Sequence, residues 1–254
     1  MTIAITRGVS PRFAECEITH IQRTPIDLII ARAQHQAYVN TLRELGCDVI
    51  ELPAEPDLPD SVFVEDTAFI LPEVAVITRP GADSRKPETE SILWVLTPLV
   101  KLVHVHEPGT LDGGDVLVLG KEIYIGLSTR SNQAAVDQLN EMLSEYGYSV
   151  TSVALQDCLH LKSAVTRVND RTLLINKNWV NASHFKSFDW IEVDPSEPHA
   201  ANCLPIGNSI IFPAAFPKTC AKLDERGYNV VTLDVSELAK AEGAVTCCSL
   251  IIQS

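Results

Sequence analysis

The chain has 254 residues, of which 46% are hydrophobic and 21% are charged, and its formal net charge is −13. This composition excludes a disordered or fibrous chain and is ordinary for a globular protein with a large core. The acidic balance argues against nucleic acid as a partner, because nucleic-acid binding needs basic patches, whereas cationic small substrates are compatible with it.

Seven cysteines occur at irregular spacings in a chain too large to depend on disulfide bonds. An odd number of cysteines in this context predicts a reducing compartment. The N-terminal residues lack the basic region and apolar stretch of a signal peptide. Uncharged apolar runs also fall short of the roughly 18 residues that a membrane span requires. We therefore expect a cytoplasmic protein with no membrane partner.

The first part of the chain predicts a strand, a helix, a second strand and a hairpin. Strands are expected at Ile3 to Thr6 and Asp48 to Leu52. A helix beginning near Asp27 and stopping at Gly46 separates them. Its expected apolar face comprises Ile30, Ala33, Ala37, Leu42 and Leu45. The hairpin is predicted from two apolar runs, Ala68 to Leu71 and Val74 to Thr78, which Pro72 and Glu73 separate.

The same order then returns along the rest of the chain. The expected elements are strands at 102–105, 149–155, 190–193 and 230–233, hairpins turning at 120–121, 169–170 and 207–208, and helices ending at Gly147 and Gly227. A unit that recurs in this way at a regular period indicates a radial or stacked array.

One position recurs just before the first hairpin strand of each unit. Asp66, Asp112, His160, Asn202 and Cys247 occupy it in turn, at separations of 46, 48, 42 and 45 residues. The last unit lacks one hairpin arm, and the N-terminal strand could complete it and close a ring. Equivalent positions of a closed ring converge near its axis, so we expect these five side chains to meet in one pocket.

Cys247 and Cys248 lie in an apolar segment that runs into a strand-like C-terminus. Such cysteines are often small hydrophobes in a core, and adjacent cysteines lack the ligand spacing of a zinc site. Because Cys247 aligns with His160 and Asp112, we favour a nucleophilic thiol with a proton-transfer partner and an orienting carboxylate.

Each proposed site residue also has a simpler interpretation when it is taken alone. His160 between two leucines is typical of a core histidine, and Asp112 in a glycine-rich segment is typical of a turn. Glu65 and Asp66 are different, because an acidic pair in an apolar segment is costly to bury without a partner. A planar guanidinium, which donates paired hydrogen bonds to a carboxylate, fits that requirement.

Two arginines, Arg85 and Arg130, each follow a predicted hairpin. If both lie on the same rim of the ring, they could hold a substrate carboxylate. Taken singly, either arginine is typical of a solvated surface.

Six motifs then carry a resemblance over nearly the whole chain: Phe63-Val64-Glu65-Asp66, Ile77-Thr78-Arg79-Pro80-Gly81-Ala82, Thr110-Leu111-Asp112-Gly113-Gly114-Asp115, Leu159-His160-Leu161-Lys162, Ala200-Ala201-Asn202-Cys203 and Thr246-Cys247-Cys248-Ser249. In this order they resemble dimethylarginine dimethylaminohydrolase, a family grouped with arginine deiminase and the amidinotransferases. The resemblance implies an α/β fold, a five-fold pseudosymmetric α/β propeller of repeated ββαβ-type units. We expect residues 1–254 to form a single catalytic domain of this kind.

The resemblance also implies roles for individual residues. Cys247 would be the nucleophile, His160 the acid and base, and Asp112 the third catalytic member. The implied substrate-binding residues are Glu65 and Asp66 on the guanidinium, Ile18, Asp60, Arg85 and Arg130 on the amino acid end, and Ala241 in the pocket wall. Asp112 stands where some members carry glutamate, and Ala241 is smaller than the branched aliphatic residue expected there.

The expected reaction is hydrolysis of dimethylarginine or monomethylarginine to citrulline and the alkylamine, through a covalent thiouronium intermediate on the cysteine. We expect no metal and no organic cofactor, a small guanidino amino acid as the ligand, and a monomer or homodimer. The alternatives are an arginine deiminase, a citrulline ureidohydrolase or an amidinotransferase of the same superfamily. A zinc or redox sensor built on the paired cysteines belongs to another class, and it would leave Asp66, Asp112 and His160 unexplained.

Overall fold

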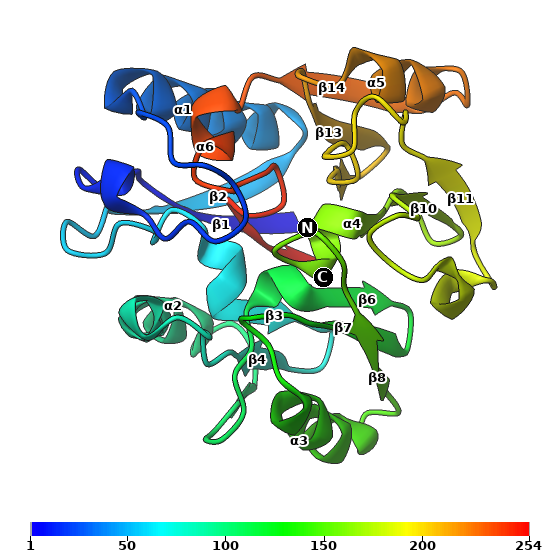
Figure 1. Cartoon of the computed structure of the whole chain (residues 1–254). Coiled ribbons are helices and arrows are strands. Elements are labelled where there is room, and N and C mark those ends of the chain that lie inside the picture. The colour runs from blue at the N-terminus through cyan, green and yellow to red at the C-terminus, as the bar shows by residue number, and fades with distance from the viewer. Residues whose placement is uncertain (1, 254) are drawn as a thin grey trace.

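The computed structural model describes residues 2–253. Within them, five three-stranded sheets surround a common centre, and the long helices lie on the outside (Figure 1). In every sheet the first strand runs antiparallel to the middle strand, which pairs in parallel with the third. The arrangement confirms the predicted α/β class and the five-fold repetition of ββαβ-type units.

The sheets are built from β15 (Leu250–Gln253), β1 (Thr2–Arg7) and β2 (Cys47–Leu52); β3 (Ala68–Ile70), β4 (Ala75–Ile77) and β5 (Leu102–His104); β6 (Val116–Leu119), β7 (Glu122–Leu127) and β8 (Ser149–Ala154); β9 (Val165–Arg167), β10 (Thr172–Ile175) and β11 (Asp189–Glu192); and β12 (Leu204–Ile206), β13 (Ser209–Pro213) and β14 (Asn229–Leu233). The α-helices are α1 (Leu28–Glu44), α2 (Thr89–Leu96), α3 (Gln133–Ser144), α4 (Leu161–Ala164), α5 (Pro217–Asp224) and α6 (Ser236–Ala239). Short 3-10 helices are η1 (Phe13–Glu15), η2 (Val64–Thr67), η3 (Asp83–Glu88), η4 (Gly113–Asp115) and η5 (Ala182–Phe185).

The two ends of the chain close the ring, as predicted. β15 pairs antiparallel with β1, so that Leu250 lies opposite Ile5 and Gln253 lies opposite Thr2. β1 in turn pairs in parallel with β2. Although Cys247 is close to the C-terminus, this pairing holds the segment just after it in a sheet, where a free end would fray.

The helix α3 illustrates how the repeats bury their connections. Val136, Leu139 and Leu143 lie on its buried face, as their spacing predicts. Asn132 caps the helix by accepting a hydrogen bond from the Ala135 N–H, and Gly147 follows with a φ of 76°. The buried face packs into the apolar cluster beside the second hairpin, and this fixes β8 against β7.

The predicted apolar face of α1 is confirmed only near its C-terminal end, where Leu42 is buried and Leu45 packs on an apolar cluster. Ala33 and Ala37 are exposed, and Ile30 is 45% exposed. The buried face is instead formed by Ala31, Gln34, His35, Tyr38, Val39, Thr41 and Leu42. This face includes polar side chains, of which Gln34 donates to the Ser236 Oγ at 2.8 Å. An apolar criterion cannot find such a face, because hydrogen bonding makes the burial of a group such as the Gln34 amide tolerable.

Two connections differ from the expected pattern. α2 fills a segment for which the sequence analysis places no helix, directly after η3, the short helix that contains Pro87. It has only eight residues, and its Trp94 is 79% exposed, so its apolar run has no clear helical face. Within residues 2–253, the connection from β10 to β11 contains only the short helix η5.

The buried apolar residues of the described chain form five clusters, which lie among the sheets and helices. Several charged or polar side chains are also buried, among them Asp66, Asp112, Asp115 and His160. No helix within residues 2–253 has both the length and the apolar character that crossing a bilayer would need.

Candidate active site

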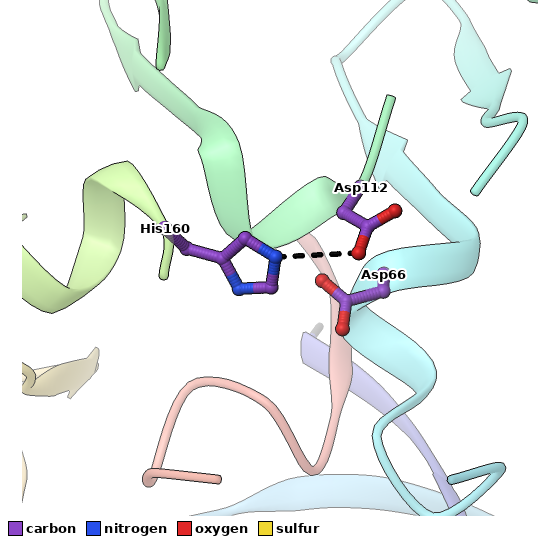
Figure 2. A group of neighbouring side chains, drawn as sticks. All are labelled: Asp66, Asp112 and His160. Carbon is purple, nitrogen blue, oxygen red and sulfur yellow. Dashed lines mark hydrogen bonds and ion pairs between the residues drawn. The ribbon is translucent and has the colours of Figure 1, made fainter. Parts of the chain in front are cut away.

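The residues that precede the first strands of neighbouring sheets meet at the centre. Asp66 lies in η2 before β3, Asp112 lies directly before η4 and β6, and His160 lies directly before α4 and β9. One carboxylate oxygen of each aspartate and one imidazole nitrogen of His160 all lie within 4.8 Å of one another (Figure 2). The convergence predicted from the repeat is confirmed for these three side chains.

The remaining two units are tied to this centre by hydrogen bonds. The carbonyl of Cys247 accepts from the N–H of Glu65 at 3.1 Å. Asn202 holds Thr246, the residue before the cysteine: its Nδ2 donates to the Thr246 Oγ1 at 3.0 Å, and its Oδ1 accepts from the Thr246 N–H at 3.1 Å. The turn that carries Cys247 is therefore anchored to two neighbouring units.

Asp112 is fixed on both of its carboxylate oxygens. Its Oδ2 lies 3.2 Å from the Nε2 of His160, and its Oδ1 accepts from the N–H of Gly81 at 2.9 Å. Burial lowers the pKa of His160, but the negative charges of Asp66, Asp115 and Asp112 oppose it and raise that pKa to about 9. The imidazole is therefore protonated at neutral pH and donates to Asp112.

Asp66 is held between a backbone donor and a guanidinium. Its Oδ1 accepts from the N–H of Gly114 at 2.8 Å, and its Oδ2 accepts from Arg85 at 2.6 Å. Burial alone would raise the pKa of Asp66, but Arg85 and His160 bring it well below its ordinary value. A Cβ at Gly114 would lie 2.5 Å from the Nδ1 of His160, so a side chain there would separate the histidine from Asp66.

Arg85 is buried, and it does not lie on a solvent-facing rim. Only 3% of it is exposed, and besides Asp66 its guanidinium donates to the Glu88 carboxylate and to the Phe63 carbonyl. Burial raises the pKa of Glu88 to about 7, with the Arg85 charge opposing this rise. A substrate carboxylate would have to displace one of these partners to bind Arg85.

Arg130 lies between Asp112 and a loop. Its Nη1 is 3.5 Å from the Oδ2 of Asp112, and its Nη2 donates to the Oγ1 of Thr19 at 3.2 Å. Thr19 follows Ile18 in a segment without helix or strand. Ile18 packs on the same apolar cluster as Ala241 and Cys247, so the loop reaches the neighbourhood of the cysteine.

The Glu242 carboxylate, which the sequence analysis missed, holds this loop in place. Glu242 accepts hydrogen bonds from the N–H groups of Thr19 at 2.7 Å, His20 at 2.7 Å and Ile21 at 3.1 Å. Its φ of 59° is uncommon for a residue with a side chain. Asp60 adds a further contact, because its carboxylate accepts from the N–H of Glu17. The sequence carries no signal for the role of Glu242, because its partners lie more than 200 residues away.

Glu65, like its neighbour Asp66, has a side chain that is already engaged by other protein groups. It forms an ion pair with Lys162 and accepts from the Thr246 Oγ1 at 2.8 Å. These residues line a cavity of about 590 Å³, whose described lining does not include Asp66 or His160. Direct contact of the Glu65 side chain with a guanidinium would require it to leave these partners.

Cys247 and Cys248 lie in a turn, and β15 begins only at Leu250. They still differ in their surroundings: Cys247 is partly exposed, whereas Cys248 is 1% exposed and packs in an apolar cluster. Burial raises the pKa of the Cys247 thiol, and the charges of Glu65 and Asp66 raise it further. The thiol is therefore neutral at rest, and a bound cation would favour the thiolate.

The cluster of Asp66, Asp112 and His160 has donor types that metal ions accept. Arg85 and Gly114 already hold Asp66, however, and His160 and Gly81 hold Asp112. Both oxygens of each of these two carboxylates therefore already have protein partners.

The raised pKa of His160 predicts how stability depends on pH. The folded protein keeps the imidazole proton to about pH 9, whereas the unfolded chain releases it near 6.5. Because the unfolded state then binds fewer protons, the free energy of unfolding should fall between these values, by on the order of 2–3 kcal/mol. Urea unfolding at pH 6.5 and 9 measures this change. A His160→Gln variant with the same decrease would contradict the assignment.

Solved structures with this fold also match the chain closely. Dimethylarginine dimethylaminohydrolase from Pseudomonas aeruginosa, complexed with citrulline, superposes with a TM-score of 0.94 at 34% identity over 98% of both chains. The N-terminal domain of ArgZ, an arginine dihydrolase, superposes with a TM-score of 0.83 at 19% identity over 99% of this chain and 97% of its own, which is a likeness of fold alone. The fold and the site together define a hydrolase that acts on amidine C–N bonds.

The sequence comparisons specify the family. A family model described as "N,N dimethylarginine dimethylhydrolase, eukaryotic" matches residues 19–253. The dimethylarginine dimethylaminohydrolase of Streptomyces coelicolor is 41% identical over 249 residues, which cover 97% of this chain and 95% of the relative. That of Pseudomonas aeruginosa is 37% identical over 226 residues, which cover 88% and 89%. The chain belongs to the dimethylarginine dimethylaminohydrolase family.

Proposed function

We propose that this protein hydrolyses dimethylarginine and monomethylarginine to citrulline and the alkylamine, through a covalent thiouronium adduct on Cys247. The observation that supports this most strongly is the cluster of Asp66, Asp112 and His160 beside the Cys247 turn, in a chain of this family. A family member complexed with citrulline, the proposed product, and another described as an adduct with S-methyl-L-thiocitrulline are consistent with the proposal.

Asp66 is the residue that we assign to the substrate guanidinium. It is buried and ionised, and it already accepts a guanidinium hydrogen bond from Arg85. A substrate guanidinium takes the place of the Arg85 guanidinium on Asp66. The Arg85 donors that this exchange frees are then available to the substrate carboxylate. Asp66 keeps the bound guanidinium oriented for attack, which lowers the barrier through positioning.

The reaction then needs a nucleophile and one group that gives and takes a proton. The bound cation offsets the negative charges around Cys247, so that the thiol releases its proton to solvent and the thiolate attacks the guanidinium carbon. His160, protonated and held by Asp112, donates its proton to the departing amine as the C–N bond breaks. Neutral His160 then takes a proton from water, hydroxide attacks the adduct, the C–S bond breaks, and citrulline leaves.

An assay with several substrates distinguishes this proposal from the related activities that would use the same Cys247, His160 and Asp112. We expect alkylamine release from methylated arginines with slow turnover of arginine, because Ala241 leaves space for methyl groups. One or two methyl groups are worth only about 1–3 kcal/mol in such a pocket. The assay supplies arginine, citrulline, monomethylarginine and dimethylarginine in parallel and quantifies citrulline, ornithine, ammonia and alkylamine. Faster ammonia release from arginine or citrulline would favour the deiminase or ureidohydrolase alternative.

At the amino acid end we propose that Ile18, Asp60, Arg85 and Arg130 hold the substrate. Arg130→Ala should raise KM far more than it lowers kcat, because the variant loses binding that substrate and transition state share. The variant should lose little affinity for agmatine, which lacks the carboxylate. Arg85→Ala should act in the same way, because the variant loses the donors that are freed for the substrate carboxylate. If Arg130→Ala lost affinity equally for both substrates, Arg130 would have a structural role and would not bind the substrate carboxylate.

We further propose that residues 1–254 act as one catalytic domain in the cytoplasm, without a metal or organic cofactor, as a monomer or homodimer. The pairing of β1 with β15 and the unpaired state of the cysteines support the single domain and the reducing compartment.

A further inference from the structure

Asp115 is a fully buried carboxylate, three residues after Asp112, to which the mechanism above gives no role. Its Oδ2 accepts hydrogen bonds from the Oγ of Ser128 at 2.6 Å and the Oγ of Ser131 at 2.7 Å. Its Oδ1 accepts from the N–H of Leu161 at 3.0 Å. The carboxylate therefore has hydrogen-bonding partners in two other segments of the chain, 128–131 and 161.

Each of these hydrogen-bond partners either adjoins a site residue in the sequence or is hydrogen-bonded to one. Leu161 follows His160, so its N–H fixes the backbone that carries the imidazole. The Oγ of Ser131 accepts from the N–H of Asp112 at 3.1 Å, and the Oγ of Ser128 accepts from the N–H of Arg130 at 3.0 Å. One carboxylate thus connects the acid–base residue, its orienting partner and an arginine at the substrate end.

The repeat marks this carboxylate as a departure from the pattern. The equivalent positions, three residues after the recurring site residue, are occupied by Phe69, Ser163, Pro205 and Leu250. Three of these four residues are apolar, as is usual where a strand enters a core. β7 makes room for the carboxylate with Gly126, at which a Cβ would lie 2.6 Å from the Asp115 Oδ1. A buried charge is costly unless it is compensated, and at the equivalent position the other four units have no charged residue.

We propose that Asp115 is a positioning residue, whose carboxylate holds His160 against Asp112 and shapes the loop that carries Arg130. It acts through these residues, and its three hydrogen bonds set their relative placement. The kinetic part of this inference rests on the proposed function, whereas its effect on the imidazole can be measured without turnover.

The charge of Asp115 supports the same role. Burial raises its pKa to about 6, with His160 and the two serine hydroxyls opposing the rise, so the carboxylate is ionised at neutral pH. The charged groups that face His160 are Asp66, Asp112 and Asp115, and each raises the imidazole pKa. Asp115 therefore helps to keep His160 protonated, as an acid for the leaving amine must be.

The test is the isosteric variant Asp115→Asn, which removes the charge and presents an amide donor to groups that are themselves donors. We expect kcat to fall by about 10- to 100-fold, as is found when groups that orient reactive residues are removed, with a smaller change in KM. NMR titration of the His160 ring should give a pKa below that of the wild type. Asp137→Asn, at an exposed site on α3, is the matched control and should change neither quantity.

Variants that each remove one hydrogen bond to Asp115 separate a positioning role from an effect on the stability of the whole protein. Ser131→Ala should lower kcat through Asp112, and Ser128→Ala should raise KM through Arg130, with the Asp115 charge intact in both. If Asp115→Asn does not fold, these two serine variants still test whether Asp115 is a positioning residue. Unchanged kinetics in both serine variants would overturn the proposal, as would an unchanged His160 pKa in folded Asp115→Asn. If the wild type turned over no methylated arginine, the proposed function would fail, but the NMR titration would still test the effect on His160.

Discussion

Replacing Cys247 with serine is expected to reduce turnover of dimethylarginine by at least roughly 10,000-fold, whereas Cys248→Ser keeps most of the activity. The two thiols are adjacent, but only Cys247 lies at the position that recurs with His160 and Asp112. It is partly exposed and lies within the field of Glu65 and Asp66, where a bound cation would favour its thiolate. Citrulline and dimethylamine formation under identical conditions measures both variants.

The neighbouring thiol provides the matched control. Cys248 is buried, and burial raises the pKa of its thiol, with Glu65 adding to the rise. Cys248→Ser places a hydroxyl in an apolar cluster, so some loss of thermal stability is expected. Comparable loss of turnover in both variants, at equal folded fractions, would contradict the assignment of Cys247 as the nucleophile.

The second large effect is expected from His160→Gln. Loss of the acid and base should lower kcat by about 100- to 10,000-fold, because neither departure of the amine nor activation of water is then assisted. Glutamine keeps a donor near Asp112 but cannot transfer the proton. Steady-state kinetics across pH measures the effect, with the exposed His106→Gln as the control.

A small loss of kcat in His160→Gln, with the wild-type pH profile retained, would contradict this role. Asp112→Asn should give a smaller decrease than His160→Gln, since Asp112 orients the imidazole and exchanges no proton itself.

The sequence predicts the repeat well, because each unit is specified by local signals. Gly147 after α3 and Asn169 in the turn between β9 and β10 are such signals, and they set the element boundaries. Once the units are aligned, the meeting of Asp66, Asp112 and His160 follows from the symmetry of a ring. The pairing of β1 with β15 was predictable for the same reason, since a single unit lacked one arm.

The details of the site depend on partners that are distant in sequence, and local pattern does not reveal them. Arg85 was expected on a rim, but its guanidinium is buried against Asp66 and Glu88. Glu242 holds a loop more than 200 residues away through backbone N–H groups, which carry no sequence signature. The resemblance names the site residues, whereas their hydrogen-bond partners are found only in the structure.

The central claim is that a cysteine adduct forms and the alkylamine leaves before water enters. Acid quenching of the protein during turnover of dimethylarginine, followed by mass analysis of the peptide containing Cys247 and Cys248, tests it most directly. The account predicts one added group on Cys247, of the same mass from monomethylarginine and dimethylarginine, because the methylated nitrogen has already departed. An added group that retains the methyls, lies on Cys248, or never forms while citrulline accumulates would contradict it.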